Sequence, residues 1–172
     1  CLEQFEVCDN MTERLAALAV LVNSPYEEEK AKALASFAEF FKDNPLVMDQ
    51  WFSVQAACRL PGALERVQQL MQHPAFTLKN PNKVRALIGA FAGQNPVGFH
   101  QADGSGYRFL ADQVITLNAL NPQIAARLLA PLTRWRKYDS ARQGLMRAEL
   151  ERILASGELS SDVFEVVSKS LA

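Results

Sequence analysis

A chain of 172 residues, 49% of them hydrophobic, is long and apolar enough to bury the core of one domain, which excludes a disordered protein. Its 18 basic and 19 acidic residues give a formal net charge of −1, without the basic excess of a dedicated nucleic-acid-binding domain. No apolar run reaches the ~18 residues of a membrane span. The odd set Cys1, Cys8 and Cys58 lacks CxxC spacing, which favours reduced thiols and a cytoplasmic location over a disulfide framework.

Helix-start signals recur along the chain as Asn or Ser followed by Pro. The side-chain oxygen of Asn or Ser accepts a hydrogen bond from the first turn, and Pro at the first helical position loses no intrahelical bond. Asn10 with Glu13, and Ser24 with Glu27, also have the spacing of capping boxes. The Asn-Pro and Ser-Pro pairs are Ser24-Pro25, Asn44-Pro45, Asn80-Pro81, Asn95-Pro96 and Asn121-Pro122.

The segments after these starts carry apolar residues at helical spacing, and strict strand-like alternation is hardly visible. We therefore predict an all-α protein of about nine helices. The apolar stripes are Leu34, Phe37, Ala38 and Phe41; Val47, Trp51, Val54 and Cys58; Val84, Leu87, Ile88 and Phe91; Leu110, Val114 and Leu117; Ile124, Leu128 and Leu132; and Met146, Leu150, Ile153 and Leu154.

Three residues are expected to end or bend helices. Gly93 and Gly157 lie where a left-handed C-cap is expected. Pro131 falls inside the helix predicted from Pro122, where its ring and missing N–H should cause a kink or an early end.

The starts repeat at an interval of two short helices. Asn44 and Asn80 are 36 residues apart (80 − 44), and Leu60 and Asn95 are 35 apart (95 − 60). Helical hairpins of the TPR and armadillo or HEAT kinds repeat every ~34 and ~40–47 residues, respectively. We therefore predict a single domain over residues 1–172, an α-superhelix of stacked helical hairpins in preference to a four-helix bundle.

No metal site is predicted. His73 and His100 are the only two histidines, and no third ligand accompanies His100 and Asp103, whereas catalytic zinc takes three protein ligands. Ser105 lies outside a GxSxG elbow, and Cys58 lies on an apolar stripe, which favours a packed thiol. The residues alone therefore indicate a non-catalytic helical domain.

The loop Asp103-Gly104-Ser105-Gly106 allows two ligand readings and one structural reading. Glycine-rich loops hold phosphates, and aspartate with carbonyl groups binds calcium, but neither a following Gly-Lys-Ser/Thr nor a suitably spaced acidic residue is present. We expect the glycines to turn the chain and Asp103 or Ser105 to cap a helix beginning near Tyr107.

The run Arg134-Trp135-Arg136-Lys137-Tyr138, with Arg142 and Arg147, mixes cations and aromatic rings as single-strand binders do. Cations also favour the end of a helix, where aromatic rings dock it on its neighbour. Because overall basicity is missing, we favour the packing role and expect no nucleic-acid partner.

The segment NPNKVRALIGAFAGQNPVGFHQADGSGYRFL, from Asn80 to Leu110, resembles the C-terminal region of bacterial aminopeptidase N, the zinc-dependent alanyl aminopeptidases. The resemblance continues through DNMTERLAAL, LVMDQWF, LNALNPQIAARL and RKYDSARQGLMRAELE, in order and over nearly the whole chain.

This resemblance implies a non-catalytic C-terminal domain, of armadillo-like fold, whose partners are the catalytic domain of the parent protein and the peptide substrate. In that family the HExxH zinc helix and the GAMEN-type motif lie upstream, and neither occurs here, so zinc is expected in the parent and no cofactor in this chain. The family's C-terminal domain covers the active site and restricts peptide access. The start at Cys1 leads us to expect a piece of a longer protein.

The resemblance also implies roles for single residues. Arg127 matches an arginine that points into the family's substrate cavity, although a surface arginine on an amphipathic helix fits equally. His100, Asp103, Gly104 and Gly106 match the family's loop and are expected to fix its shape. Two other functions stay open: a free-standing helical-repeat scaffold for a protein partner, and nucleic-acid binding through residues 134–147.

Overall fold

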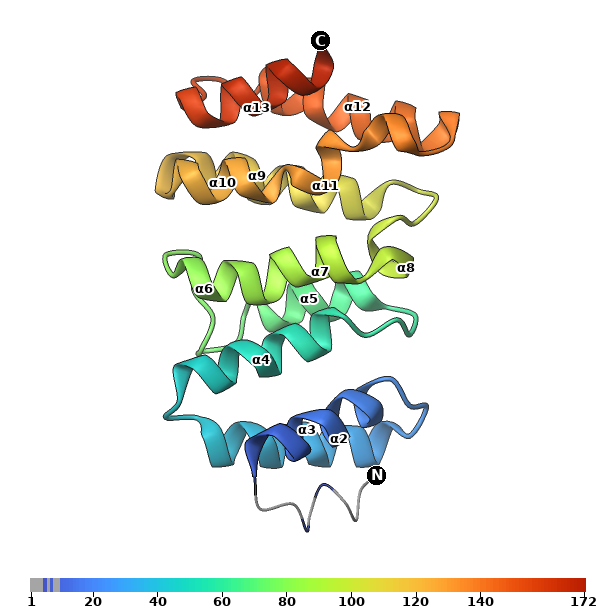
Figure 1. The fold of residues 1–172 in the computed structure, drawn as a ribbon, viewed down its shortest axis with the longest axis vertical. Helices are drawn as coiled ribbons and strands as arrows, with labels where there is room; N and C mark the ends of the chain where they lie inside the picture. The colour runs from blue at the N-terminus through green and yellow to red at the C-terminus, as the bar shows by residue number, and fades with distance from the viewer. Residues whose placement is uncertain (1–4, 6, 8–9) are drawn as a thin grey trace.

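The computed structural model describes Phe5, Val7 and residues 10–172, and these form helices without any strand. The helices stack in layers from the N-terminal to the C-terminal end, as Figure 1 shows. The predicted all-α stack is confirmed over this part of the chain. Its described residues divide into more helices than the nine expected, because several long segments contain a break.

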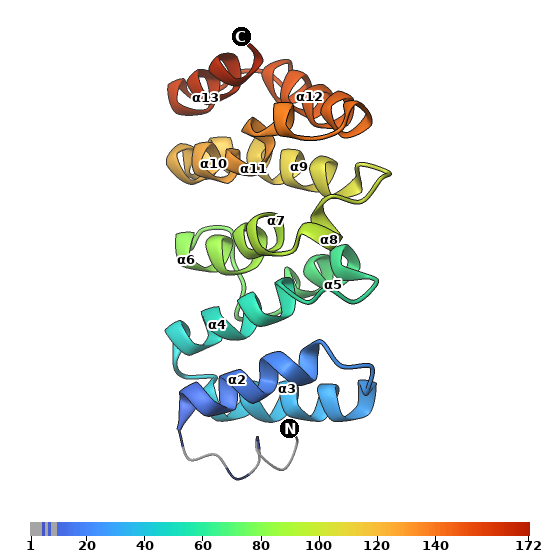
Figure 2. The same ribbon diagram turned by 45° about the vertical axis from the view of Figure 1, so that its right-hand side comes forward.

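Successive helices alternate between two rows, which Figure 2 separates to the left and the right from the layer of α4 and α5 upward. One row holds α2 (Met11–Val22), α4 (Pro45–Ala56), α6 (Pro81–Val84), α7 (Ala90–Gln94), α10 (Pro122–Leu128), α11 (Ala130–Thr133) and α13 (Ser161–Leu171). The other row holds α3 (Glu27–Phe41), α5 (Ala63–Leu70), α9 (Ser105–Leu120) and α12 (Ser140–Leu154). The one-turn helix α8 (Pro96–Phe99) links α7 to α9.

The asparagine helix starts are confirmed. In each case a side-chain oxygen accepts a hydrogen bond from a backbone N–H of the first turn, which satisfies a group that has no partner within the helix. The caps and their donors are Asn10 with Glu13, Asn44 with Val47, Asn80 with Asn82, Asn95 with Gly98, and Asn121 with Ile124.

The predicted start at Ser24-Pro25 is wrong. Helix α3 begins at Glu27 with Tyr26 as its N-cap residue. The Ser24 hydroxyl instead donates to the carbonyl of Leu21 at 2.7 Å, so it completes the end of α2 and is unavailable to cap the next helix.

Of the predicted helix ends, Gly157 and Pro131 are confirmed and Gly93 is wrong. Gly157 has φ +122°, and α10 ends at Leu128, ahead of Pro131. Gly93 continues α7, which stops only at Gln94. The stop belongs to Asn95, because a residue before proline is displaced from the helical conformation.

Asn95 joins two layers of the stack. It is fully buried, and its Nδ2 donates to the carbonyls of Ala56 at 2.9 Å and Cys58 at 2.7 Å. Its Oδ1 accepts the Gly98 N–H at 3.0 Å. One carboxamide therefore satisfies the open carbonyls at the end of α4 and the open N–H at the start of α8.

A π-helical segment, Arg85–Gly89, connects α6 to α7 into one long rod. Within it the carbonyl of Ala86 accepts a hydrogen bond from the Ser53 hydroxyl of α4 at 2.9 Å. This hydrogen bond ties the π-helical turn to the neighbouring helix α4.

A buried ion pair also holds α6 against α4. Lys83 Nζ lies 2.7 Å from Asp49 Oδ1, with only 7% and 17% of the two side chains exposed. Lys83 also donates to the carbonyl of Pro45 at 3.0 Å and lies over the Phe52 ring. These additional contacts offset the desolvation of the Lys83 charge.

The Asn95 contacts predict a large loss of stability when this side chain is shortened to alanine. Asn95→Ala should lower the free energy of unfolding by about 3 kcal/mol, because it leaves buried carbonyl and N–H groups unpaired. Asn44→Ala removes one exposed cap and should cost only ~1 kcal/mol. Urea unfolding of both variants tests this, and equal losses would contradict the joining role of Asn95.

Candidate functional site

The connection from α8 to α9 brings His100 into a cluster of aromatic rings. His100 Nδ1 lies 2.8 Å from the Tyr107 hydroxyl. The Tyr138 ring is tilted by 30° from the plane of the imidazole, with centroids 4.4 Å apart, and the rings of Phe99 and Tyr107 meet the imidazole edge-on. The imidazole is therefore enclosed by contacts from the α8–α9 corner and from the residues before α12.

Arg142 fastens the start of α12 to this corner. Its Nε donates to the backbone carbonyl of His100 at 3.1 Å, and its Nη1 pairs with Asp139 Oδ2 at 2.9 Å. Burial of the ring, followed by the nearby Arg142 charge, lowers the pKa of His100 below its ordinary value.

The glycines of the loop meet two separate requirements. Gly104 has φ +70°, a backbone conformation that favours glycine. Gly106 has no room for a side chain, since a Cβ there would lie 2.2 Å from the carbonyl oxygen of Phe99. The close approach at Gly106 lets α9 begin directly against α8.

Asp103 faces the start of α9. Its Oδ1 accepts the Ser105 N–H at 3.0 Å, and this hydrogen bond holds the pKa of Asp103 below its usual range. His100 and Asp103 therefore bond to different partners and do not converge on one point. Among the described residues, no group of three or more His, Cys, Asp or Glu side chains is arranged to hold a metal ion.

Two shallow depressions flank this loop. One, of about 470 Å³, lies between the start of α5 and the α8–α9 corner, and Gln101, Asp103 and Ser105 are among its lining residues. The other, of about 480 Å³, is lined by Val97, His100, Tyr138 and Arg142, among others. Both hold polar groups suited to hydrogen bonding, but His100 is engaged with Tyr107, so no base is poised beside Ser105.

Arg127 lies on α10, far along the chain from this loop. Its side chain is exposed, and within the described part of the chain no hydrogen bond or ion pair holds its guanidinium. The neighbouring Leu128 packs beside Gly89, whose absent Cβ would lie 3.8 Å from Leu128 Cδ2. Arg127 is therefore presented to solvent from a helix that is itself firmly packed.

The basic and aromatic run is largely used in packing. Trp135 Nε1 donates to the Ser170 carbonyl at 3.1 Å, and Arg136 stacks on the Trp135 ring while donating to the same carbonyl at 2.9 Å. Arg147 pairs with Glu151. Within the part of the chain that the structure describes, only Arg134 and Lys137 of the run extend as exposed cations without such contacts, and two charges are few for phosphate recognition.

Cys58 is buried, and its Sγ lies 3.2 Å from the Val22 carbonyl, as expected for a packed thiol. Cys1 and Cys8 lie outside the described residues. No helix in the described part of the chain is long and apolar enough to cross a membrane.

The sequence matches the family described as "Domain of unknown function (DUF3458_C) ARM repeats" over residues 1–172. The chain belongs to this family. The match confirms the predicted helical superhelix.

Three bacterial relatives carry the name aminopeptidase N. The chain is 45% identical to that of Escherichia coli (strain K12) and covers 19% of its length. It is 46% identical to that of Caulobacter vibrioides, covering 20%, and 44% identical to that of Haemophilus influenzae, covering 19%. Each match takes in 98–99% of this chain.

Among solved structures, Legionella pneumophila aminopeptidase A in complex with aspartic acid matches with a TM-score of 0.92 and 42% identity, over 98% of this chain and 20% of that one. The chain thus spans about one fifth of the length of these relatives and corresponds to the C-terminal part of the aminopeptidases N. The resemblance to the C-terminal domain of bacterial aminopeptidase N is confirmed.

The contact at Gly106 predicts a strong effect of one methyl group. Gly106→Ala should lower the free energy of unfolding by about 3 kcal/mol, because the Phe99 carbonyl cannot move without displacing α8. Gly144→Ala is the matched control: nothing lies within 4 Å of its added Cβ, and it should stabilise α12 by ~0.5–1 kcal/mol. Thermal unfolding distinguishes the two, and tolerance of Gly106→Ala would contradict the close approach.

The lowered pKa of His100 predicts a pH-dependent stability. The folded state binds fewer protons than the unfolded state, whose histidine titrates near ~6.5, so the stabilisation is complete above that pH and is lost as pH falls below it. The midpoint temperature of thermal unfolding should therefore decrease as the pH is lowered from about 7 to 5. His100→Asn should make this decrease smaller. An unchanged slope in the variant would refute the assignment to His100.

Proposed function

We propose that this chain is the C-terminal cap of a zinc-dependent aminopeptidase, an enzyme that removes N-terminal amino acids from peptides. In this proposal the helical stack encloses the active-site chamber and controls which peptides enter. The observation that carries the proposal is the match of almost the whole chain to the C-terminal fifth of three aminopeptidases N.

The chemistry is assigned to the remainder of the parent protein. The described residues offer no three-ligand metal group, and catalytic zinc takes three protein ligands, so zinc would be held by the parent's catalytic domain. The chain itself would position peptides that enter the chamber and exclude others, and it would catalyse nothing in isolation. We place the parent hydrolase in the cytoplasm, with neither nucleic acid nor a membrane as partner.

The stacked hairpins suit the role of a wall. The α4 helix is fastened to the next layer through the buried polar contacts of Asn95 and Lys83, so exposed side chains there project from a rigid support. Arg127 is the candidate to face the chamber, where a guanidinium would bind a peptide carboxylate or carbonyl. His100, Asp103, Gly104 and Gly106 would fix the loop and would not touch the substrate.

The Arg127 assignment predicts a selective kinetic defect in the parent enzyme. Arg127→Ala should lower kcat/KM for peptides with a free C-terminal carboxylate by about tenfold, since one charge-assisted hydrogen bond is lost. Amidated peptides and aminoacyl reporter substrates should change less than about twofold, because they lack that carboxylate.

Arg134→Ala is the matched control, since Arg134 is an exposed arginine in the turn directly after α11, and it should leave kcat/KM for all three substrate classes unchanged. Equal kinetics of wild type and Arg127→Ala on free-carboxylate peptides would contradict a contact with substrate.

A further inference from the structure

A third depression, of about 320 Å³, lies between the end of α4 and one face of α5. Four of its residues, from Arg66 to His73, are spaced at i, i+3, i+4 and i+7, so they share one helical face. The hydrogen bond from the His73 N–H to the Leu70 carbonyl, 3.0 Å long, continues this face past the end of α5. The lining residues are Gln55, Arg66, Gln69, Leu70, Gln72 and His73.

Arg66 brings to this depression a positive charge that has no acidic partner. Its Nη1 donates to the Pro61 carbonyl at 2.7 Å, and its Nη2 donates to the Leu60 carbonyl at 2.9 Å and lies 3.5 Å from Cys58 Sγ. These uncharged acceptors hold the guanidinium in place without neutralising it. Within the described part of the chain no carboxylate pairs with Arg66, and its buried Nε lacks a hydrogen-bond partner. A buried donor of this kind favours an acceptor from outside the chain.

Two further groups present N–H donors at nearly fixed positions. His73 Nδ1 accepts the Ala75 N–H at 3.1 Å, which leaves the proton of the neutral imidazole on Nε2. The ring is held by Trp51 and Phe52, whose centroids lie 5.1 and 5.6 Å away. Gln55 is only 8% exposed, and its Nε2 donates to the Trp51 carbonyl at 3.1 Å. This bond uses one of the two N–H groups of the carboxamide, so the other is available.

The remaining lining residues decide the kind of ligand. Gln69 and Gln72 are exposed, and no hydrogen bond within the described residues holds their carboxamides. No acidic side chain of the described residues lines the depression, which disfavours a metal cation. Leu70 is the one hydrophobic residue of the lining, and an apolar ligand would leave the donors unpaired. One unpaired cation surrounded by N–H donors is suited to an oxyanion.

We propose that this depression binds a small molecule through a single carboxylate group. One guanidinium charge balances one carboxylate charge, and N–H groups of Arg66, His73 and Gln55 would donate to its oxygens. A volume of about 320 Å³ lies at the small end of ligand pockets, which span ~300–1,000 Å³. The bound carboxylate would join the end of α4 to α5. This site goes beyond the proposed cap function and does not depend on it.

Nuclear magnetic resonance of the 172-residue chain tests the proposal with sodium propionate as the probe. The Nε–H signal of Arg66 and the side-chain amide signals of Gln55 should shift and saturate, with a Kd of ~1–10 mM as expected for so small a ligand. Propionamide, a neutral molecule of the same shape, should shift these signals at least about tenfold less at equal concentration, since it offers no charge to Arg66. Ionic strength is held constant with sodium chloride throughout.

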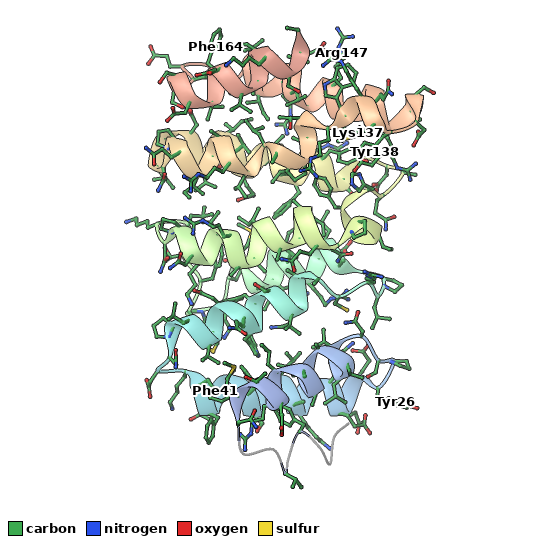
Figure 3. The ribbon with its side chains drawn as sticks, viewed as in Figure 1. Tyr26, Phe41, Lys137, Tyr138, Arg147 and Phe164 are labelled. Carbon is green, nitrogen blue, oxygen red and sulfur yellow. The ribbon has the colours of Figure 1, made fainter. Side chains whose placement is uncertain are left out.

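A pair of matched variants tests the role of the Arg66 charge. Gln69→Glu places a carboxylate three residues from Arg66 on the same helical face, where it would neutralise the guanidinium. It should weaken propionate binding at least about tenfold without lowering the thermal midpoint, because position 69 is exposed. Lys137→Gln lowers the net charge equally, but Figure 3 shows Lys137 in a layer above α5. Binding by this control should stay within about twofold of wild type.

Three results would overturn the proposal. The first is a set of shifts that does not saturate or that is equal for propionate and propionamide, because neither shows recognition of a carboxylate. The second is unchanged propionate binding by Gln69→Glu. The third is inorganic phosphate binding at least about tenfold more tightly than propionate, which would assign the depression to phosphate. Peptidase activity enters none of these measurements, so their outcome is separate from that of the proposed function.

Discussion

The buried carboxamide of Asn95 is the contact on which the rest of the stack depends, because it bonds backbone groups of two layers at once. The end of α4 leaves the carbonyls of Ala56 and Cys58 open, and the start of α8 leaves the Gly98 N–H open. Water cannot reach these groups, so a side chain must satisfy them. Asn95 thereby fixes the direction in which α8 leaves α7, and with it the position of the loop that carries His100 and Gly106.

Other side chains also bond backbone carbonyls about one hairpin away in the sequence. The Cys58 thiol and the Val22 carbonyl are 36 residues apart in sequence, Ser53 and Ala86 are 33 apart, and Trp135 and Ser170 are 35 apart. These separations match the interval of one helical hairpin, so each contact ties a hairpin to the next one. A stack joined in this way is stiff, because its close-packed layers resist compression and are bonded to one another.

Local sequence rules predicted the parts of the fold that local chemistry decides. The asparagine caps and apolar stripes were predictable because the partners lie within four residues. The predictions at Ser24 and Gly93 were wrong because nearby residues decide the helix ends. The Ser24 hydroxyl bonds the end of the preceding helix, and the Asn95-Pro96 pair ends α7 after Gly93. The π-helical segment and the Lys83–Asp49 pair were not predictable, because each depends on a partner from another layer.

The candidate site also has one part that local sequence predicts and another part that depends on residues distant in the sequence. A glycine-rich turn was readable in the Asp103 to Gly106 run, since glycine and aspartate favour turns. The enclosure of His100 by Tyr107, Tyr138 and Arg142 was not, because Arg142 reaches the His100 carbonyl from 42 residues away. Arg127 carried no local signal of function and was singled out through the family resemblance alone.

The role we propose for this domain is control of access to an active site that lies elsewhere in the parent. Its most direct test compares a parent truncated before this segment with the same protein after the 172-residue chain is added back, using peptides of increasing length. We expect truncation to abolish activity or length discrimination, addition of the chain to restore it, and the chain alone to hydrolyse nothing. A truncated parent that keeps full activity and the same length discrimination would contradict it.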